Sequence, residues 1–254
     1  MKLLEGKVAL VTGAGGGLGR SHALALAAEG AKVVVNDPGV SRDGSGGAGA
    51  RMADAVVAEI KKAGGEAVAN YDSVADAGDK VVKTAVDAFG RIDILVNNAG
   101  ILRDKTIHNM TDDMWDLVLA VHLRGTFLCT RAAAKVMKEK GAGGRIINTT
   151  SVAGLKGNFG QSNYSAAKAA LAANTKTWSL EFAPFGVRVG AIAPGMIETP
   201  MTQGMNQKAR DALVAAVPVG RVGVPEDIWR AVRFVLECDY FNGRTIDVDG
   251  GLAM

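Results

Sequence analysis

The chain has 254 residues, of which 48% are hydrophobic and 22% charged, and its formal net charge is +3. This composition excludes an intrinsically disordered chain, which is poorer in apolar residues and carries more net charge. A small net charge without a dense basic run also argues against nucleic-acid binding. The length permits one large α/β domain over residues 1–254, with a well-buried core.

The N-terminus and the cysteines indicate where the protein is located. Residues 1–6 are too short and too charged for a signal peptide. We find no apolar run of the ~18 residues that a membrane span requires. Cys129 and Cys238 cannot form a disulfide framework and are interpreted as buried free thiols, and no His/Cys cluster has metal-ligand spacing. We therefore expect a cytoplasmic protein without membrane association and without a metal.

The first elements form a strand, a glycine turn, a helix and a second strand. An apolar run over 7–12 is typical of a strand and leads into Gly13-Ala14-Gly15-Gly16-Gly17-Leu18-Gly19. A helix is expected over 20–29 and a strand over 32–36, followed by Asp37. In such a unit the glycines let a pyrophosphate approach the helix N-terminus, and an acid at this distance meets the adenosine ribose. Without that frame, the glycines would indicate only a flexible loop.

Strand-like and helix-like segments alternate over the rest of the chain. Further strands are expected near 66–70, 92–96, 144–149, 187–192 and 244–248, and further helices near 51–63, 75–88, 112–139, 160–182 and 225–237. This alternation predicts parallel βαβ units. The expected fold is a single-domain α/β Rossmann fold with a doubly wound, mostly parallel sheet of seven strands.

Two segments interrupt the alternation. Residues 38–50 contain five glycines and are expected to form a mobile loop. Residues 194–217 begin at the carboxyl end of the sixth strand, where ligands bind in this topology. We expect this segment to be a substrate lid in which Met196 and Met201 contact an apolar substrate. An ordinary variable loop is the alternative.

Ser151, Tyr164 and Lys168 form a candidate acid/base site. Residues four apart lie on one face of a helix, so the phenol of Tyr164 and the ammonium of Lys168 would point the same way. A nearby cation lowers the pKa of a tyrosine from its usual value of ~10. The Ser151 hydroxyl could then hold a substrate oxygen while Tyr164 moves a proton to or from it. The alternative is a surface pair that arises by chance.

The chain resembles the short-chain dehydrogenase/reductase family over nearly its whole length. The matching motifs are Thr12-Gly13-x-x-x-Gly17-x-Gly19, Asn97-Asn98-Ala99-Gly100, Ser151 with Tyr164-x-x-x-Lys168, Pro194-Gly195 with Thr199, and Asp247-Val248-Asp249-Gly250-Gly251. The resemblance implies an alcohol dehydrogenase with NAD as cofactor. The implied cofactor-binding residues are Gly13, Gly15, Gly17, Leu18, Gly19, Asp37, Asp72, Ser73, Val74, Asn98, Ala99, Gly100, Tyr164, Lys168, Pro194, Gly195, Ile197 and Thr199. The implied substrate contacts are Ser151, Tyr164, Met196 and Met201.

One branch of the family is especially similar. Residues 33–37, 98–104 and 157–161 look like the 3-hydroxyacyl-CoA dehydrogenase part of peroxisomal multifunctional enzyme type 2, also described as 17β-hydroxysteroid dehydrogenase type 4. This likeness implies an acyl-CoA or a steroid as the small-molecule substrate. The family is usually dimeric or tetrameric, so a homodimer or homotetramer is expected.

His122 departs from the family pattern. The family commonly has a catalytic asparagine in an Asn-x-x-Gly stretch, and here the stretch is His122-Leu123-Arg124-Gly125. A neutral imidazole both donates and accepts, so His122 is a candidate replacement that holds a relay water. The alternative is a packing histidine that is satisfied by a backbone carbonyl. His22 and His108 have no motif context and are expected at the surface or at helix ends.

Several functions stay open at this point. They are an NAD-dependent 3-hydroxyacyl-CoA dehydrogenase, a 17β-type hydroxysteroid dehydrogenase, a reductase of 3-oxoacyl carrier-protein substrates that would use NADPH, and a non-catalytic dinucleotide sensor. The presence of all three acid/base residues counts against the sensor. Arg103, Lys105 and Lys156 could meet CoA phosphates or could be solvated surface cations.

Overall fold

The central element is a parallel sheet of seven strands. The computed structural model describes residues 2–41, 43–46, 52–198 and 207–253. Within them the strand order is β3-β2-β1-β4-β5-β6-β7, and every pairing is parallel. The strands are β1 (Val8–Thr12), β2 (Lys32–Asn36), β3 (Ala67–Asn70), β4 (Ile94–Asn97), β5 (Gly144–Thr149), β6 (Val187–Pro194) and β7 (Thr245–Val248). The predicted Rossmann fold is confirmed.

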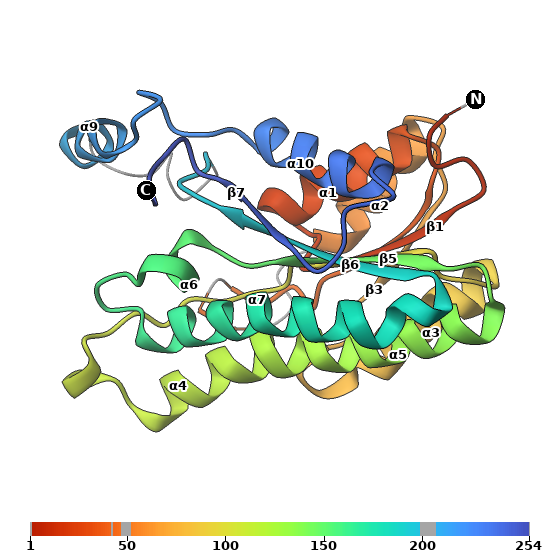
Figure 1. Ribbon diagram of the computed structural model, residues 1–254, viewed down its shortest axis with the longest axis horizontal. Coiled ribbons are helices and arrows are strands. Elements are labelled where there is room, and N and C mark those ends of the chain that lie inside the picture. Colours follow the sequence, from red (N-terminus) through yellow and green to blue (C-terminus); the bar gives the residue numbers. More distant parts are fainter. Residues whose placement is uncertain (1, 42, 47–51, 199–206, 254) are drawn as a thin grey trace.

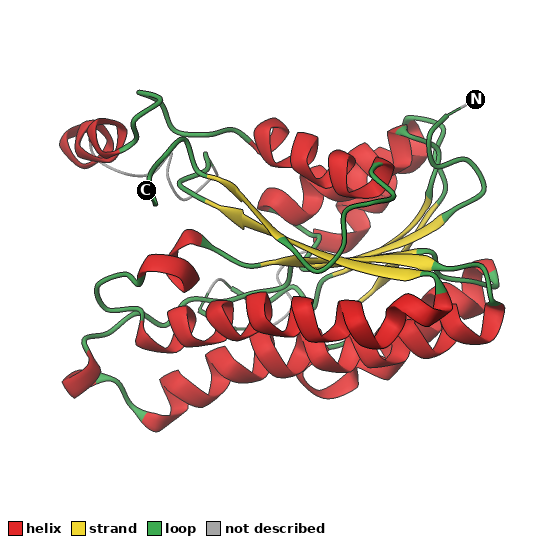
Figure 2. Cartoon of the chain, in the orientation of Figure 1, coloured by secondary structure: helices red, strands yellow, loops and turns green. Residues whose placement is uncertain are grey.

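Helices cover both faces of the sheet (Figures 1 and 2). On one face lie α1 (Gly17–Ala28), α2 (Met52–Lys62) and α10 (Pro225–Glu237), and on the other α3 (Val74–Phe89), α5 (Gly125–Lys140) and α7 (Ser162–Phe182). Because both faces are covered, β1 and β4 are buried along their whole length. Continuous apolar strands, rather than alternating ones, are typical of such a sheet.

The chain changes direction across the sheet at β1. It runs from β1 outward to β2 and β3, then returns to place β4 on the other side of β1. In an open parallel sheet this reversal opens a crevice at the carboxyl ends of the strands. The glycine turn after β1 and the segments after β4 and β5 all line that crevice.

The stretch expected as one helix over 112–139 contains three parts. These are α4 (Asp112–Leu119), a π-helical turn (Ala120–Arg124) and α5, and the turn is closed by a bond from the Gly125 N–H to the Ala120 carbonyl. Asp112–Lys140 is also long and apolar enough to cross a membrane by length and composition alone. In this structure its apolar residues pack against α3, α7 and the sheet. Buried core helices pass the same test.

Some elements are absent from the sequence-based prediction. They are the helices α6 (Val152–Lys156) and α9 (Gln207–Ala216) and two 3₁₀ turns, Ile107–Asn109 and Ala183–Phe185. Two single residues also differ. His22 is buried in α1, with 1% of its surface exposed, instead of lying at the surface. Cys129 is a buried free thiol as expected, whereas Cys238 is only partly buried.

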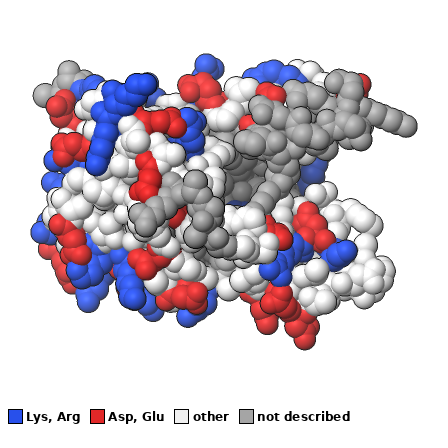
Figure 3. Space-filling model, turned by 180° about the vertical axis from the view of Figure 1, so that it is seen from behind, with Lys and Arg blue, Asp and Glu red and all other residues white. Residues whose placement is uncertain are grey.

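Charged side chains of both signs are intermingled on the face shown in Figure 3. No continuous basic area is visible among the described residues of that face. Charge on this side therefore gives no sign of a polyanion-binding surface.

Candidate active site

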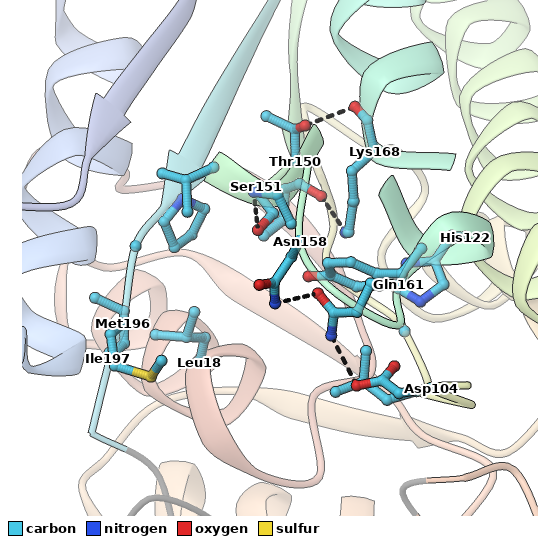
Figure 4. Close-up of a pocket in the computed structure, with 18 of the residues that line it drawn as sticks. Leu18, Asp104, His122, Thr150, Ser151, Asn158, Gln161, Lys168, Met196 and Ile197 are labelled. Carbon is cyan, nitrogen blue, oxygen red and sulfur yellow. Dashed lines mark hydrogen bonds between the residues drawn. The ribbon is translucent and has the colours of Figure 1, made fainter. Parts of the chain in front are cut away.

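A cavity of about 900 Å³ opens at the carboxyl ends of β4, β5 and β6 (Figure 4). All four residues predicted to be catalytic line it: Ser151, Tyr164, Lys168 and His122. Ser151 follows β5, Tyr164 and Lys168 lie on α7, and His122 lies in the π-helical turn. The fold therefore brings together side chains that are up to 46 positions apart in sequence, from His122 to Lys168.

Ser151 is the N-cap residue of α6. Its hydroxyl oxygen accepts a hydrogen bond from the Ala153 N–H at 3.2 Å. A serine hydroxyl has two acceptor sites and one rotatable hydrogen, so the cap leaves the hydrogen available. Ser151 can thus donate a hydrogen bond to an oxygen in the cavity.

Lys168 is buried beside Tyr164. Only 3% of its surface is exposed, its ammonium donates to the Thr149 carbonyl, and Nζ lies 5.5 Å from the centre of the Tyr164 ring. Burial lowers the pKa of Lys168 to about 7, because the charged form loses its hydration. A negative charge on the phenol would offset that cost, so the ammonium and a phenolate would stabilise each other.

The close packing of α6 on α7 holds this arrangement. A side chain at Gly154 would place its Cβ 2.7 Å from the backbone carbonyl carbon of Lys168. The Thr150 hydroxyl donates to the Lys168 carbonyl at 2.7 Å. These contacts fix the start of α7 against the segment that carries Ser151.

His122 is anchored to the backbone of Ile101. Its Nε2 lies 3.0 Å from the Ile101 nitrogen and 2.8 Å from the Ile101 oxygen, which agrees with a packing histidine satisfied by the backbone. The ring also meets Tyr164 edge-on, with centroids 5.2 Å apart and an interplanar angle of 89°. A Cβ at Gly100 would lie 2.3 Å from the His122 ring, so this contact requires glycine.

The ring of His122 is neutral in the folded protein. Burial, followed by the charge of Lys168, lowers its pKa to about 3. Nδ1 is buried and has no hydrogen-bond partner among the described residues. Nε2 either accepts the Ile101 N–H or donates to the Ile101 carbonyl, depending on which ring nitrogen carries the hydrogen.

A second cavity, of about 540 Å³, adjoins the first and shares Asn98, Gly100 and Ile101 with it. Its lining includes the predicted cofactor residues Gly13, Gly17, Asp37, Ser73, Val74, Asn98, Ala99 and Gly100. The Asp37 carboxylate accepts the Gly15 N–H at 2.9 Å and the Gly39 N–H at 2.8 Å. Two backbone donors therefore fix the carboxylate at the end of β2.

The glycine turn fits the backbone of a dinucleotide. Gly13 has φ of 61°, and a Cβ there would lie 2.7 Å from Ala99 Cα. A Cβ at Gly19 would lie 2.1 Å from the Gly13 oxygen, so α1 can start close to β1 only with glycine at this position. The free N–H groups at the N-terminus of α1 are a favourable site for a phosphate.

Comparisons with known proteins agree with this geometry. A family model described as short chain dehydrogenase matches residues 7–210. The chain belongs to the short-chain dehydrogenase family. It is therefore an oxidoreductase of a family that uses a nicotinamide dinucleotide.

The relatives of this short-chain dehydrogenase are named for different activities. It is 47% identical to a 3-oxoacyl-[acyl-carrier-protein] reductase from Synechocystis over 100% of both chains. It is 50% identical to mouse peroxisomal multifunctional enzyme type 2 over 83% of this chain, but spans only 29% of that protein. A crystal structure of a candidate short-chain alcohol dehydrogenase from Sinorhizobium meliloti has a TM-score of 0.88 at 34% identity, with 98% of this chain and 97% of that chain covered.

The remaining predicted cofactor and substrate residues of this short-chain dehydrogenase lie in different parts of the structure. Leu18, Pro194, Gly195, Met196 and Ile197 line the large cavity. Gly15 packs against Asp37 and Met52, and Gly19 packs against Gly13 and Asn98. The Asp72 carboxylate accepts a hydrogen bond from the Asn70 side-chain amide at 2.8 Å. Thr199 and Met201, with the middle of the expected lid over 194–217, lie outside the described residues.

Asp104, Asn158, Gln161 and Leu252 are among the residues of the large cavity to which sequence analysis gave no role. The first three lie in segments that were noted for their family resemblance but were given no role. Nothing in the sequence indicates that the C-terminal turn reaches the cavity through Leu252. Of the three cations considered for CoA phosphates, Arg103 pairs with Asp113 at 2.6 Å and Lys156 donates to the Leu252 carbonyl at 2.6 Å.

Proposed function

We propose that this short-chain dehydrogenase interconverts the 3-hydroxyl and 3-oxo groups of acyl-CoA thioesters with NAD. The observation that carries the redox assignment is the buried Lys168 beside Tyr164, in one cavity with Ser151. The likeness to the multifunctional enzymes and to a reductase of 3-oxoacyl groups supports the thioester as substrate. A non-catalytic sensor would not require a buried lysine, which is costly to the fold.

In the proposed mechanism, the Ser151 hydroxyl holds the reacting oxygen of the substrate by donating a hydrogen bond. Tyr164, as phenolate, takes the proton of the secondary alcohol at its Oη. The positive charge of Lys168 would stabilise that phenolate. Bound NAD supplies the hydride acceptor. In the reverse direction Tyr164 returns the proton to the carbonyl oxygen of a ketone.

Residues of both cavities would hold the dinucleotide. Gly13 to Gly19 would bind the pyrophosphate, and Asp37 would accept hydrogen bonds from the adenosine ribose. Asp72, Ser73 and Val74 would frame the adenine, and Asn98, Ala99 and Gly100 would lie beneath the ribose. Lys168 would bind the nicotinamide ribose. Pro194, Gly195, Ile197 and Thr199 would contact the carboxamide.

One alternative has an observation in its favour. The Synechocystis relative named as a 3-oxoacyl-[acyl-carrier-protein] reductase matches the whole length of the chain. Its named substrate shares the reacting carbon and the thioester but has a protein carrier in place of CoA. Asp37 disfavours this alternative where the reductase requires NADPH, because a carboxylate would face the additional phosphate.

Steady-state kinetics with four substrates test the proposal. They are (3R)- and (3S)-hydroxybutanoyl-CoA with NAD, a 17β-hydroxysteroid with NAD, and a 3-oxoacyl carrier protein with NADPH. We expect the highest kcat/KM for one of the two CoA esters. A higher value for the carrier protein with NADPH would assign the alternative, and a higher value for the steroid would contradict both thioester assignments.

A further inference from the structure

Three polar side chains form a hydrogen-bonded chain on one wall of the large cavity (Figure 4). The Gln161 amide nitrogen donates to the Asp104 carboxylate at 2.8 Å. The Asn158 amide nitrogen donates to the Gln161 side-chain oxygen at 2.9 Å. All three residues line the cavity that also contains Ser151 and Tyr164. None of them has a part in the proton transfer described above.

Backbone contacts hold this wall in place. The Lys105 N–H donates to the Gly160 carbonyl at 2.8 Å, which joins the segment after β4 to the segment before α7. The Gln161 carbonyl accepts the Ser165 N–H at 2.8 Å, so Gln161 begins the helix that carries Tyr164. Gln161 is also the buried member of the three, with 9% of its surface exposed.

The carboxylate of Asp104 determines which group of each neighbouring amide donates and which accepts. A carboxylate can only accept hydrogen bonds, so Gln161 must turn its NH₂ group toward Asp104. Its oxygen then faces Asn158, which must donate through its own NH₂ group. An amide orientation is normally ambiguous, but here the carboxylate fixes both amides. Asn158 Oδ1 is left as an acceptor with no hydrogen-bond partner among the described residues.

We propose that Asn158 Oδ1 is a substrate subsite that accepts a hydrogen bond from an amide N–H of the thioester carrier. This inference rests on the proposed thioester function. CoA and acyl carrier proteins both present such an N–H a few bonds from the sulfur, and a steroid has none. Asn158 is exposed at the cavity, and an acceptor held in this orientation favours an N–H over an oxygen at the same position of the substrate, because two lone pairs would otherwise face each other. Asp104 is the positioning residue of this subsite.

Two small thioesters isolate this single hydrogen bond. They are 3-hydroxybutanoyl-N-acetylcysteamine and the matching S-(2-acetoxyethyl) thioester, in which an oxygen stands in place of the N–H. We expect wild-type kcat/KM with NAD to favour the N–H compound by about fivefold or more, the effect of one lost hydrogen bond. The ratio is an internal control, because a general loss of activity affects both substrates equally.

Variants test the direction of the amide chain. In Asp104→Asn the new amide can donate, so both amides can reverse and Asn158 can present an N–H instead. We expect the preference to fall to within about twofold, and Asn158→Ala to have the same effect. Asp112→Asn, an equal change of charge at the exposed start of α4, should keep the wild-type ratio. Thermal unfolding would confirm that all variants fold.

The outcomes separate the subsite from the proposed function. Equal kcat/KM for the two thioesters in the wild type would overturn the subsite and leave the thioester function intact. An unchanged preference in Asp104→Asn or in Asn158→Ala would do the same. Turnover of a hydroxysteroid, without turnover of either thioester or of 3-hydroxybutanoyl-CoA, would overturn the proposed function and the subsite with it.

Discussion

Burial sets the protonation state of the two ionisable residues that flank Tyr164. Lys168 and His122 are 3% and 2% exposed, and burial lowers the pKa of each, to about 7 and to about 3. The neutral ring of His122 therefore adds no second positive charge beside the Lys168 ammonium. Its contacts with Ile101 and with the edge of Tyr164 make it a positioning residue in our account.

His122→Asn should make the fold less sensitive to acid. Between pH ~6.5 and ~3 the histidine is protonated in the unfolded chain but not in the folded one, so its contribution to stability is lost as the pH falls through this window. Asparagine does not titrate, and its side-chain amide has both a donor and an acceptor for the Ile101 backbone. We expect the free energy of unfolding, measured with urea at pH 7 and 4.5, to fall less in the variant than in the wild type.

His108→Asn is the matched control for this experiment. His108 is exposed, so its replacement should leave the acid sensitivity at the wild-type level. The buried His22, whose pKa burial lowers to about 4, contributes equally to all three proteins. Identical losses of stability for His122→Asn and the wild type would show that His122 does not carry this effect.

Asp37 should determine the choice of cofactor. Its carboxylate is fixed by the Gly15 and Gly39 N–H groups at the edge of the smaller cavity. The additional phosphate of NADP would repel it by up to ~4 kcal/mol at close range, less where solvent screens the pair. We expect wild-type kcat/KM to favour NAD, and Asp37→Ala to narrow the ratio by about tenfold or more. A wild-type ratio near one would remove Asp37 from this role.

At the scale of elements, the sequence predicts the seven strands within about two residues, because each is an apolar run bounded by turn residues. It misses α6, whose five residues are too short for a helical period, and α9, which lies inside the expected lid. It also misses the π-helical turn. One additional residue in a turn leaves the apolar pattern of a long helix almost unchanged.

The sequence predicts some residues of the candidate site and misses others, because only some of them follow a local pattern. Tyr164, Lys168 and Ser151 follow from the spacing on one helix and the end of one strand. The contact of Asp104 with Gln161 joins two loops 57 positions apart in sequence, and no local pattern encodes it. The lid over 194–217 stays a prediction.

Gly19→Ala should disturb the unit of β1, glycine turn and α1. The new Cβ would meet the Gly13 oxygen at 2.1 Å, and backbone cannot move aside as a side chain can. We expect a loss of about 1–3 kcal/mol in the free energy of unfolding, together with weaker NADH binding. Gly16→Ala is the control for stability, because its Cβ would meet only the flexible end of Met52, at 3.3 Å. Equal stability of the two variants would contradict the proposed packing.

At the scale of the whole molecule, apolar side chains are exposed on two regions of helix surface. Trp115 and Phe127, on α4 and α5, are 36% and 42% exposed, and Phe234 and Tyr240, at and after α10, are 46% and 100% exposed. Exposed apolar patches are typical of interfaces. Together with the family resemblance, they support the proposal of a homodimer or homotetramer.

Light scattering at micromolar concentration tests the assembly. We expect a mass of two or four times the 26.2 kDa of one chain. Phe127→Glu should shift the mass toward smaller species, because a charge would be buried in the interface. A wild-type mass equal to one chain would contradict the proposal.

The central claim of this account is that Tyr164 transfers the proton in the large cavity, and Tyr164→Phe tests it most directly. The variant keeps the ring that meets His122 and loses only the phenolic hydroxyl. The account predicts that kcat for 3-hydroxyacyl-CoA oxidation falls by ~10²–10⁴-fold, whereas the dissociation constant of NADH, measured by fluorescence titration, stays close to the wild-type value. Near-normal turnover by the phenylalanine variant would contradict it.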